Sequence, residues 1–290
     1  MKQRRTDLAL EARELWQENA GETTRLEGVA ARETLREGMA VTRVDILDGR
    51  GEKALGKPRG TYVTVMLEGV AERAEDAPAR AARAVAAELA ALLPAEGTVL
   101  VAGLGNRAVT PDAIGPRVHE RVLVTRHLVE EMPERFGALR PVASLAAEVL
   151  GNTGVESGAV VRAVCEAVRP ACVIAVDALA ARSMERLCRA VQIADTGIVP
   201  GSGVGNHRVP LTRESLGVPV IALGVPTVVD GATLAADLLG SEEGEVGRGL
   251  LVTPKDIDSR VADLSAILSR AINLALQPGL TEADLEQLLE

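Results

Sequence analysis

Aromatic residues are almost missing from this chain. Of its 290 residues only Trp16, Tyr62 and Phe136 are aromatic, although 47% of the residues are hydrophobic. The core must therefore be built from Ala, Val, Leu and Ile, a composition that suits helices layered on a parallel sheet. The chain has no aromatic platform on which bases could stack, and its net charge of -9 opposes binding to phosphates. We expect no direct nucleic-acid binding, whereas a basic protein partner would be attracted.

Cysteine is scarce, and long hydrophobic runs are missing. Cys165, Cys172 and Cys188 form an odd-numbered set without the spacing of metal ligands, which predicts small buried thiols in a reducing compartment and no disulfide framework. The charged amino terminus is not followed by the apolar core of a signal peptide, and no later segment has about 18 uninterrupted apolar residues. We expect a cytoplasmic protein that makes no membrane contact.

The length is sufficient for one large core, so we assign residues 1–290 to a single domain, with the acidic, glycine-rich segment 241–249 as a mobile surface loop. Apolar runs of strand type alternate with segments of helical period, which indicates βαβ units and the α/β class. We expect strands at 41–47, 61–67, 98–102, 173–177, 191–194 and 218–223, and helices at 8–18, 77–93, 115–131, 155–168 and from Thr253 or Asp256 onward. The polar stretch 19–38 shows no clear period, and 48–60 has the composition of a turn or long hairpin.

Two of the expected strands end close to an aspartate. The apolar run 99–102 leads through Gly103 and Gly105 to Asp112, and the run 173–176 is followed at once by Asp177. Strands buried on both faces deliver such acids to the carboxyl edge of a parallel sheet, where open α/β sheets place their active sites. The sequence therefore predicts a carboxylate pair made by Asp112 and Asp177.

Each member of this pair has a simpler structural explanation. Gly103 and Gly105 could merely permit a tight strand exit, with Asp112 capping the next helix; the third glycine of a dinucleotide-binding fingerprint is absent. Asp177 weakens that explanation, because an acid at a buried strand end is costly unless it is paired or protonated. Two facing carboxylates would share a proton and supply a general base for water and a general acid for a leaving amine.

A glycine-rich loop, residues 195–208, is the other candidate region. It begins with Asp195-Thr196-Gly197, which is also the active-site signature of pepsin-like proteases, but those are all-β proteins and this chain is rich in helical pattern. We therefore interpret the tripeptide as a turn that lines the same cleft. The end of the loop could hold an anion through backbone N–H groups or form a rim for substrate. The candidate cleft residues are Asn106, Asp195, Gly203, Asn206, His207 and Arg208.

Ten segments, in order and over nearly the whole chain, match the pattern of one family. They are Arg5 to Ala9, Gly56-Lys57-Pro58 to Thr64, Gly103 to Asn106, Thr110 to Pro116, Val124 to Leu128, Gly151 to Gly154, Asp177 to Ser183, Asp195 to Arg208, Gly224 to Asp230 and Val252 to Lys255. In these segments the chain resembles the germination proteases of spore-forming bacteria.

This resemblance implies an endopeptidase that degrades small acid-soluble spore proteins during germination, in the cytoplasm of the forespore and spore core. It also implies a zymogen, a homotetramer, and a three-layer αβα sandwich around a mostly parallel sheet. That fold is similar to hydrogenase maturation proteases, with added strands near the N-terminus. The family is regarded as atypical aspartic proteases, and its two essential aspartates fall on Asp112 and Asp177. No cofactor and no metal are expected.

The resemblance places a processing site between Asp7 and Leu8, with residues 1–7 as a short propeptide. A charged, untethered terminus with few apolar residues should extend easily into a cleft, because its own burial is too weak to hold it. Protonation of Asp7 in acid should favour its entry beside two carboxylates.

Two alternatives to the shared-proton peptidase stay open. The same aspartates could hold a divalent metal, as the likeness to hydrogenase maturation proteases allows, although no histidine is clustered with them in sequence. From a different class of function, the chain could be a non-catalytic acidic carrier that binds basic spore proteins.

Overall fold

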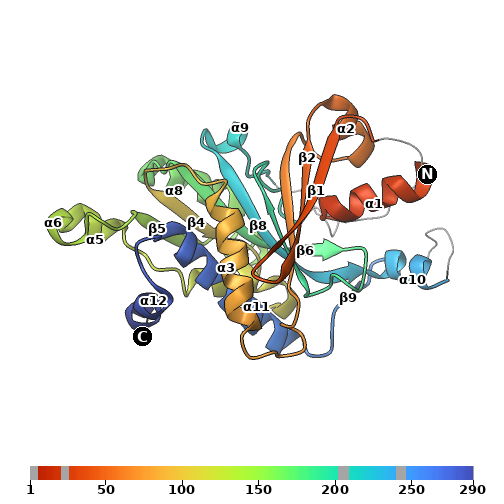
Figure 1. The fold of residues 1–290 in the computed structure, drawn as a ribbon. Helices are drawn as coiled ribbons and strands as arrows, with labels where there is room; N and C mark the ends of the chain where they lie inside the picture. Colours follow the sequence, from red (N-terminus) through yellow and green to blue (C-terminus); the bar gives the residue numbers. More distant parts are fainter. Residues whose placement is uncertain (1–5, 21–25, 202–208, 240–245, 290) are drawn as a thin grey trace.

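One large sheet with helices on both of its faces forms the molecule (Figure 1). The computed structural model describes residues 6–20, 26–201, 209–239 and 246–289. The strand order is β1-β2-β3-β7-β8-β6-β4-β5, and β9 pairs with β8. The α/β class and the added strands near the N-terminus are confirmed. We expected a mostly parallel sheet, but the sheet is mixed. The strands β1, β2, β3 and β7 pair antiparallel, and β7 also pairs antiparallel with β8.

The strands are β1 (Val29–Arg36), β2 (Met39–Ile46), β3 (Gly60–Met66), β4 (Val99–Gly103), β5 (Val142–Ala146), β6 (Cys172–Ala181), β7 (Ala190–Ala194), β8 (Val220–Asp230) and β9 (Leu251–Val252). The helices of eight residues or more are α1 (Ala9–Ala20), α3 (Ala77–Ala90), α8 (Ser157–Val168), α10 (Gly231–Leu239), α11 (Ile257–Leu276) and α12 (Glu282–Leu289). The shorter helices are α2 (Gly49–Leu55), α4 (Ile114–His119), α5 (Arg126–Glu131), α6 (Pro133–Phe136), α7 (Leu150–Thr153), α9 (Arg213–Leu216) and the 3₁₀ turn η1 (Thr110–Asp112).

The parallel half of the sheet consists of β5, β4, β6 and β8. Every residue of β4 and β8 is buried, which explains why these strands read as continuous apolar runs without alternation. The last pair between β4 and β6 is Gly103 with Val176, but β6 continues to Ala181. The carboxyl end of β6 therefore extends past β4, and the segment after β4 turns away at this edge.

The antiparallel half consists of β1, β2, β3 and β7. Seven of the eight residues of β1 are exposed, so this strand has no buried face and no apolar period, which is why the stretch 19–38 gave no strand signal. The segment 48–60, expected to be a turn or hairpin, contains α2. Asp48 caps that helix by accepting hydrogen bonds from the backbone of Arg50 and Gly51.

Helix α11 packs against both α3 and α4 over one side of the sheet, and α8 packs over the other side against β4. The predicted apolar stripe of α11 is confirmed, since all five of its positions, Ile257, Val261, Leu264, Leu268 and Ile272, are buried. The single helix expected over 115–131 is two, α4 and α5. Between them Leu123 donates its N–H to Asn273 Oδ1 at 2.9 Å, and Thr125 donates its N–H to Val142 O at 3.0 Å, so these backbone groups leave the helical ladder.

The three cysteines are buried and form no disulfide, as predicted. Burial raises the pKa of Cys165 and Cys172 to about 11 and that of Cys188 to about 12, which keeps these thiols protonated.

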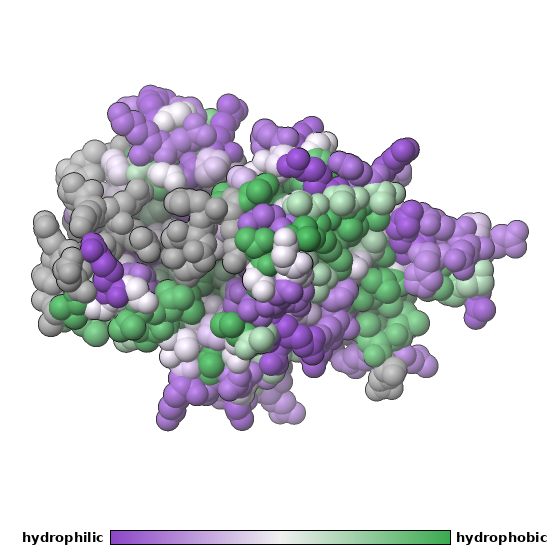
Figure 2. Space-filling view, turned by 180° about the vertical axis from the view of Figure 1, so that it is seen from behind, coloured by the Kyte–Doolittle hydropathy of each residue, from purple (hydrophilic) through white to green (hydrophobic). Residues whose placement is uncertain are grey.

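Seen from behind, hydrophilic residues cover the projecting parts of the surface, and apolar residues appear in patches between them (Figure 2). Among the described residues no helix is long and apolar enough to cross a bilayer. Of the predicted loop 241–249, residues 241–245 lie outside the described residues, and 246–249 form turns.

Candidate active site

Asp112 is held at the end of the loop that follows β4. Its Oδ2 accepts a hydrogen bond from the backbone N–H of Asn106 at 2.8 Å. The hydroxyl of Thr227, fully buried on β8, donates to the carbonyl of Pro111 at 2.7 Å. These two contacts fix η1 against two parallel strands, so the position of the Asp112 carboxylate is set by the sheet.

The glycines after β4 are required by close packing. A Cβ on Gly103 would lie 2.2 Å from the carbonyl oxygen of Gly115, and Gly105 has φ +109° with its α-carbon directly against the backbone of Asp112. The glycines therefore permit a tight strand exit, and the exit delivers Asp112 to the sheet edge. The expectation that Asp112 caps the next helix is wrong, because the N-cap of α4 is Ala113 and no side chain caps that helix.

Asp177 lies on β6 and is only 5% exposed. Its Oδ1 accepts a hydrogen bond from the backbone N–H of Ala178 at 2.9 Å. In the sheet it stands next to Gly224 of β8, which in turn pairs with Gln192 of β7. Residues paired across neighbouring strands point to the same face, so Asp177, Gly224 and Gln192 form one row.

Asp112 and Asp177 line the same cavity, which has a volume of about 560 Å³. The predicted convergence of the two acids on one edge of the sheet therefore occurs. Two carboxylates in one partly enclosed site can divide the roles of general base and general acid between them. Among the described residues no group of three or more His, Cys, Asp or Glu side chains is arranged to hold a metal ion.

The predicted cleft residues differ in whether they line the cavity. Thr196 and Gly197 line the cavity, so the turn beginning at Asp195 does contribute to the cleft. Asp195 itself is turned to β3, where its Oδ1 accepts from the backbone N–H of Thr61 at 2.8 Å; neither it nor Asn106 lines the cavity. Gly203, Asn206, His207 and Arg208 lie outside the described residues.

The segment Thr6–Leu8 also reaches this site, but it is firmly bound and not loose as we expected. The backbone N–H of Asp7 donates to Ala180 O at 3.0 Å, and Ala180 donates its N–H to Asp7 Oδ2 at 2.8 Å. Leu8 is completely buried. Low apolar content suggested a free terminus, but polar contacts with β6 and burial of Leu8 and Ala9 hold this segment in place.

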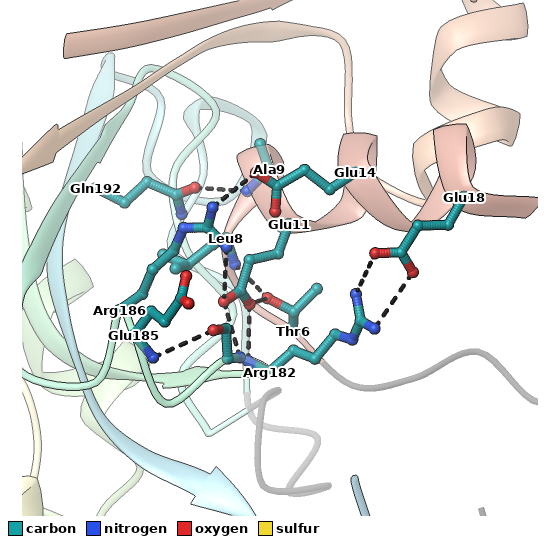
Figure 3. Close-up of polar contacts among 11 residues, drawn as sticks. Thr6, Leu8, Ala9, Glu11, Glu14, Glu18, Arg182, Glu185, Arg186 and Gln192 are labelled. Atoms are coloured by element: carbon teal, nitrogen blue, oxygen red, sulfur yellow. Dashed lines mark hydrogen bonds and ion pairs between the residues drawn. The ribbon is translucent and has the colours of Figure 1, made fainter. Parts of the chain in front are cut away.

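A buried carboxylate anchors the start of α1 (Figure 3). Glu11 is 0% exposed and accepts from the backbone N–H groups of Arg182 at 2.7 Å and Ser183 at 3.0 Å. It also accepts from the hydroxyl of Thr6 and lies 3.5 Å from a guanidinium nitrogen of Arg186. A buried acid with this many donors fixes residues 6–11 against the end of β6.

Three residues that our sequence reasoning did not assign to the site also line the cavity. They are Lys57, Tyr62 and Gln192. Tyr62 donates its hydroxyl to Pro58 O at 2.8 Å, and burial raises its pKa to about 12, so it stays protonated. The one signal available for Gln192 was a polar residue inside an otherwise apolar strand; Lys57 stood in a matched motif without an assigned role.

Comparisons with known proteins identify the family. A family model described as germination protease matches residues 9–241. A germination protease of Caldanaerobacter subterraneus subsp. tengcongensis is 46% identical over 321 aligned positions, which cover 98% of each chain. The chain belongs to the germination protease family.

Other members of the germination protease family match over the same extent. The enzyme of Clostridium perfringens is 42% identical and covers 98% of both chains. Among solved structures, a [NiFe] hydrogenase maturation protease, HycI, from Thermococcus kodakarensis aligns with a TM-score of 0.37 and 18% identity, covering 64% of this chain and 98% of its own. The family assignment makes the chain a protease of spore germination.

Proposed function

We propose that this protease hydrolyses peptide bonds in small acid-soluble spore proteins with Asp112 and Asp177 acting as a proton-sharing pair. The observation that supports this proposal is their placement: both carboxylates line one cavity, although they come from different strand ends. The ionised member takes a proton from water, the water oxygen adds to the carbonyl carbon, and the protonated member gives its proton to the departing amine.

The substrate class is compatible with the charge of the chain. Its net charge of -9 would attract a basic polypeptide and would repel the phosphate backbone of DNA. A cleavage assay tests the proposal directly. Purified protein is incubated with a small acid-soluble spore protein, with and without a chelator, and fragments are identified by mass spectrometry.

Each outcome of this assay decides between the alternatives. Cleavage that is insensitive to the chelator supports the proton-sharing pair. Activity that is lost with chelator and restored by a divalent metal would replace it with the metal-dependent peptidase. Binding without any cleavage, under every activating condition, would favour the acidic carrier.

We also propose that the chain is a zymogen that cuts itself between Asp7 and Leu8. The support is again positional, since Asp7 lines the cavity that contains Asp112 and Asp177.

We further propose a homotetramer, which light scattering coupled to gel filtration would test. The exposed edge of β1, where Leu35 is 79% exposed, is available for subunit contacts.

A further inference from the structure

Lys57 is a half-buried cation that lines the cavity and that the proposed proton-sharing pair does not use. Its Nζ donates to the carbonyl oxygen of Asp7 at 2.9 Å and lies 3.4 Å from that of Thr6. Burial lowers the pKa of Lys57, while the nearby acids Asp7 and Glu11 oppose that effect. Removing an ammonium group from water is costly, and a neutral donor could anchor a terminus at lower cost. Asp7 and Glu11 offset part of this cost, and the ammonium group donates directly to a backbone carbonyl, which a cationic donor polarises more strongly than a neutral one.

The same carbonyl oxygen has a second donor. Gln192 donates its Nε2 to Asp7 O at 2.9 Å, and its Oε1 accepts from the backbone N–H of Ala9 at 2.7 Å. The contact with Ala9, visible in Figure 3, fixes the amide so that its nitrogen faces Asp7. One backbone carbonyl therefore receives two donors at 2.9 Å, one of them cationic. This is the arrangement that stabilises negative charge developing on a carbonyl oxygen.

The sheet sets Gln192 on the same face as Asp177. Gln192 and Asp177 belong to one row with Gly224 between them, which places them two strands apart, roughly 10 Å between α-carbons. Gly224 has no side chain, and Leu179 covers it. All of these residues line the cavity, as Lys57 does. A peptide segment lying across this row has donors at its carbonyl on one side and carboxylates on the other.

We propose that Lys57 and Gln192 form the carbonyl-binding site of the cleft, which holds and polarises the carbonyl of the peptide bond presented to Asp112 and Asp177. In this structure the Asp7 carbonyl occupies the site. The inference rests on the proposed peptidase function for its catalytic part. When water adds to the carbonyl carbon, the π electrons move to the oxygen, and the two donors stabilise that oxyanion until the C–N bond breaks and the amine leaves with a proton.

Kinetics on a spore-protein substrate test the catalytic part. Lys57→Met should lower kcat about a hundredfold with KM nearly unchanged, as loss of one oxyanion donor does. Lys57→Arg, which keeps a cationic donor, should recover most of the activity. Gln192→Glu keeps the oxygen that accepts from Ala9 but cannot donate, so it should also lower kcat. Lys53→Met, an exposed lysine on neighbouring α2, is the matched control and should behave as the wild type.

A measurement without turnover tests the binding part. With ¹³C at aspartate carbonyls and ¹⁵N at leucine, only Asp–Leu peptide bonds give a coupled NMR signal: Asp7–Leu8, Asp237–Leu238, Asp263–Leu264 and Asp284–Leu285. In an Asp112→Asn chain, which should stay uncut, the Asp7 carbonyl signal should move upfield when Lys57→Met or Gln192→Glu removes a donor. Lys53→Met should not move it, and the other three signals serve as internal references.

The possible results separate the two levels of the proposal. An Asp7 carbonyl signal that is indifferent to both substitutions overturns the carbonyl-binding site. A signal that moves, together with a kcat that does not fall in Lys57→Met, overturns the catalytic role. If the wild type cleaves nothing under any activating condition while the signal moves as expected, the proposed peptidase function fails and the carbonyl-binding site stands as a binding site alone.

Discussion

The two halves of the sheet contribute different groups to the site, and the inner strands differ from the edge strand β1 in burial. In the parallel half, β4 and β8 are buried along their whole length, so strand ends that bear acids are rigidly placed. In the antiparallel half, β1 is almost entirely exposed and β3 and β7 contribute polar side chains to the cavity wall. The cavity lies where the halves meet. One half supplies carboxylates, and the other supplies hydrogen-bond donors for a polypeptide backbone.

The largest expected effect concerns the acids of the parallel half. Asp112→Asn and Asp177→Asn should each reduce peptidase activity on the order of a hundredfold or more, because an amide keeps the size of the side chain but cannot exchange the proton. Circular dichroism should show an unchanged fold. Asp195→Asn is the matched control, because this acid binds the start of β3 outside the cavity, and its effect should be mild. A complete loss in Asp195→Asn, or substantial activity in either of the first two variants, would mean that the wrong acids have been chosen.

The next effect measures the difference in burial directly. Ile174→Ala in β6 removes a fully buried side chain and should lower the free energy of unfolding by about 2 to 5 kcal/mol. Leu35→Ala in β1 removes a side chain that is 79% exposed and should change it by less than about 0.5 kcal/mol. Urea unfolding monitored by circular dichroism provides both values. Similar losses for the two variants would contradict the assignment of β1 as a solvent-exposed edge.

Self-cleavage examines the point where the halves meet, because Asp7 binds Ala180 of one half and Gln192 of the other. Cleavage of the peptide bond between Asp7 and Leu8 should be faster at mildly acidic than at neutral pH, since protonation of Asp7 removes its repulsion from Asp112 and Asp177. Intact-mass spectrometry over time measures it, and Asp112→Asn should stay uncut. An unchanged wild-type mass, or the same truncation in Asp112→Asn, would contradict self-processing.

The smallest effect lies in the antiparallel half, at the start of α2. Hydrogen bonding from the Arg50 side chain and backbone lowers the pKa of Asp48 from 3.8 to about 2. A lowered folded-state pKa means that the ionised acid stabilises the fold above about pH 4, and that this contribution is lost as the pH falls toward 2. Asp48→Asn keeps a helix-capping side chain but does not titrate. Its melting temperature should fall slightly below that of the wild type near neutral pH and converge with it near pH 2; a constant difference would contradict the assignment.

Sequence reasoning succeeded where burial imposes a period or a composition. The strands carrying Asp177 and preceding Asp112, and the apolar stripe of α11, were predictable because their surroundings demand apolar residues at fixed positions. The strand β1 was not, because a strand exposed on both faces leaves no pattern. Lys57 and Gln192 were missed for another reason. Their role depends on contacts with Asp7, a residue more than a hundred positions from Gln192, and no local pattern encodes such a contact.

The anchor around Glu11 has a consequence for the making of the protein. Its carboxylate binds the backbone N–H of Arg182, and 171 positions separate the two residues. At about 5 to 20 residues per second, a ribosome needs roughly 10 to 30 s to extend the chain across that interval. For most of this time Lys57 and α2, which also contact the N-terminal segment, are already made, whereas the backbone donors of Glu11 are not. The anchor that fixes this segment in its own cleft is therefore completed only after the end of β6 has been synthesised.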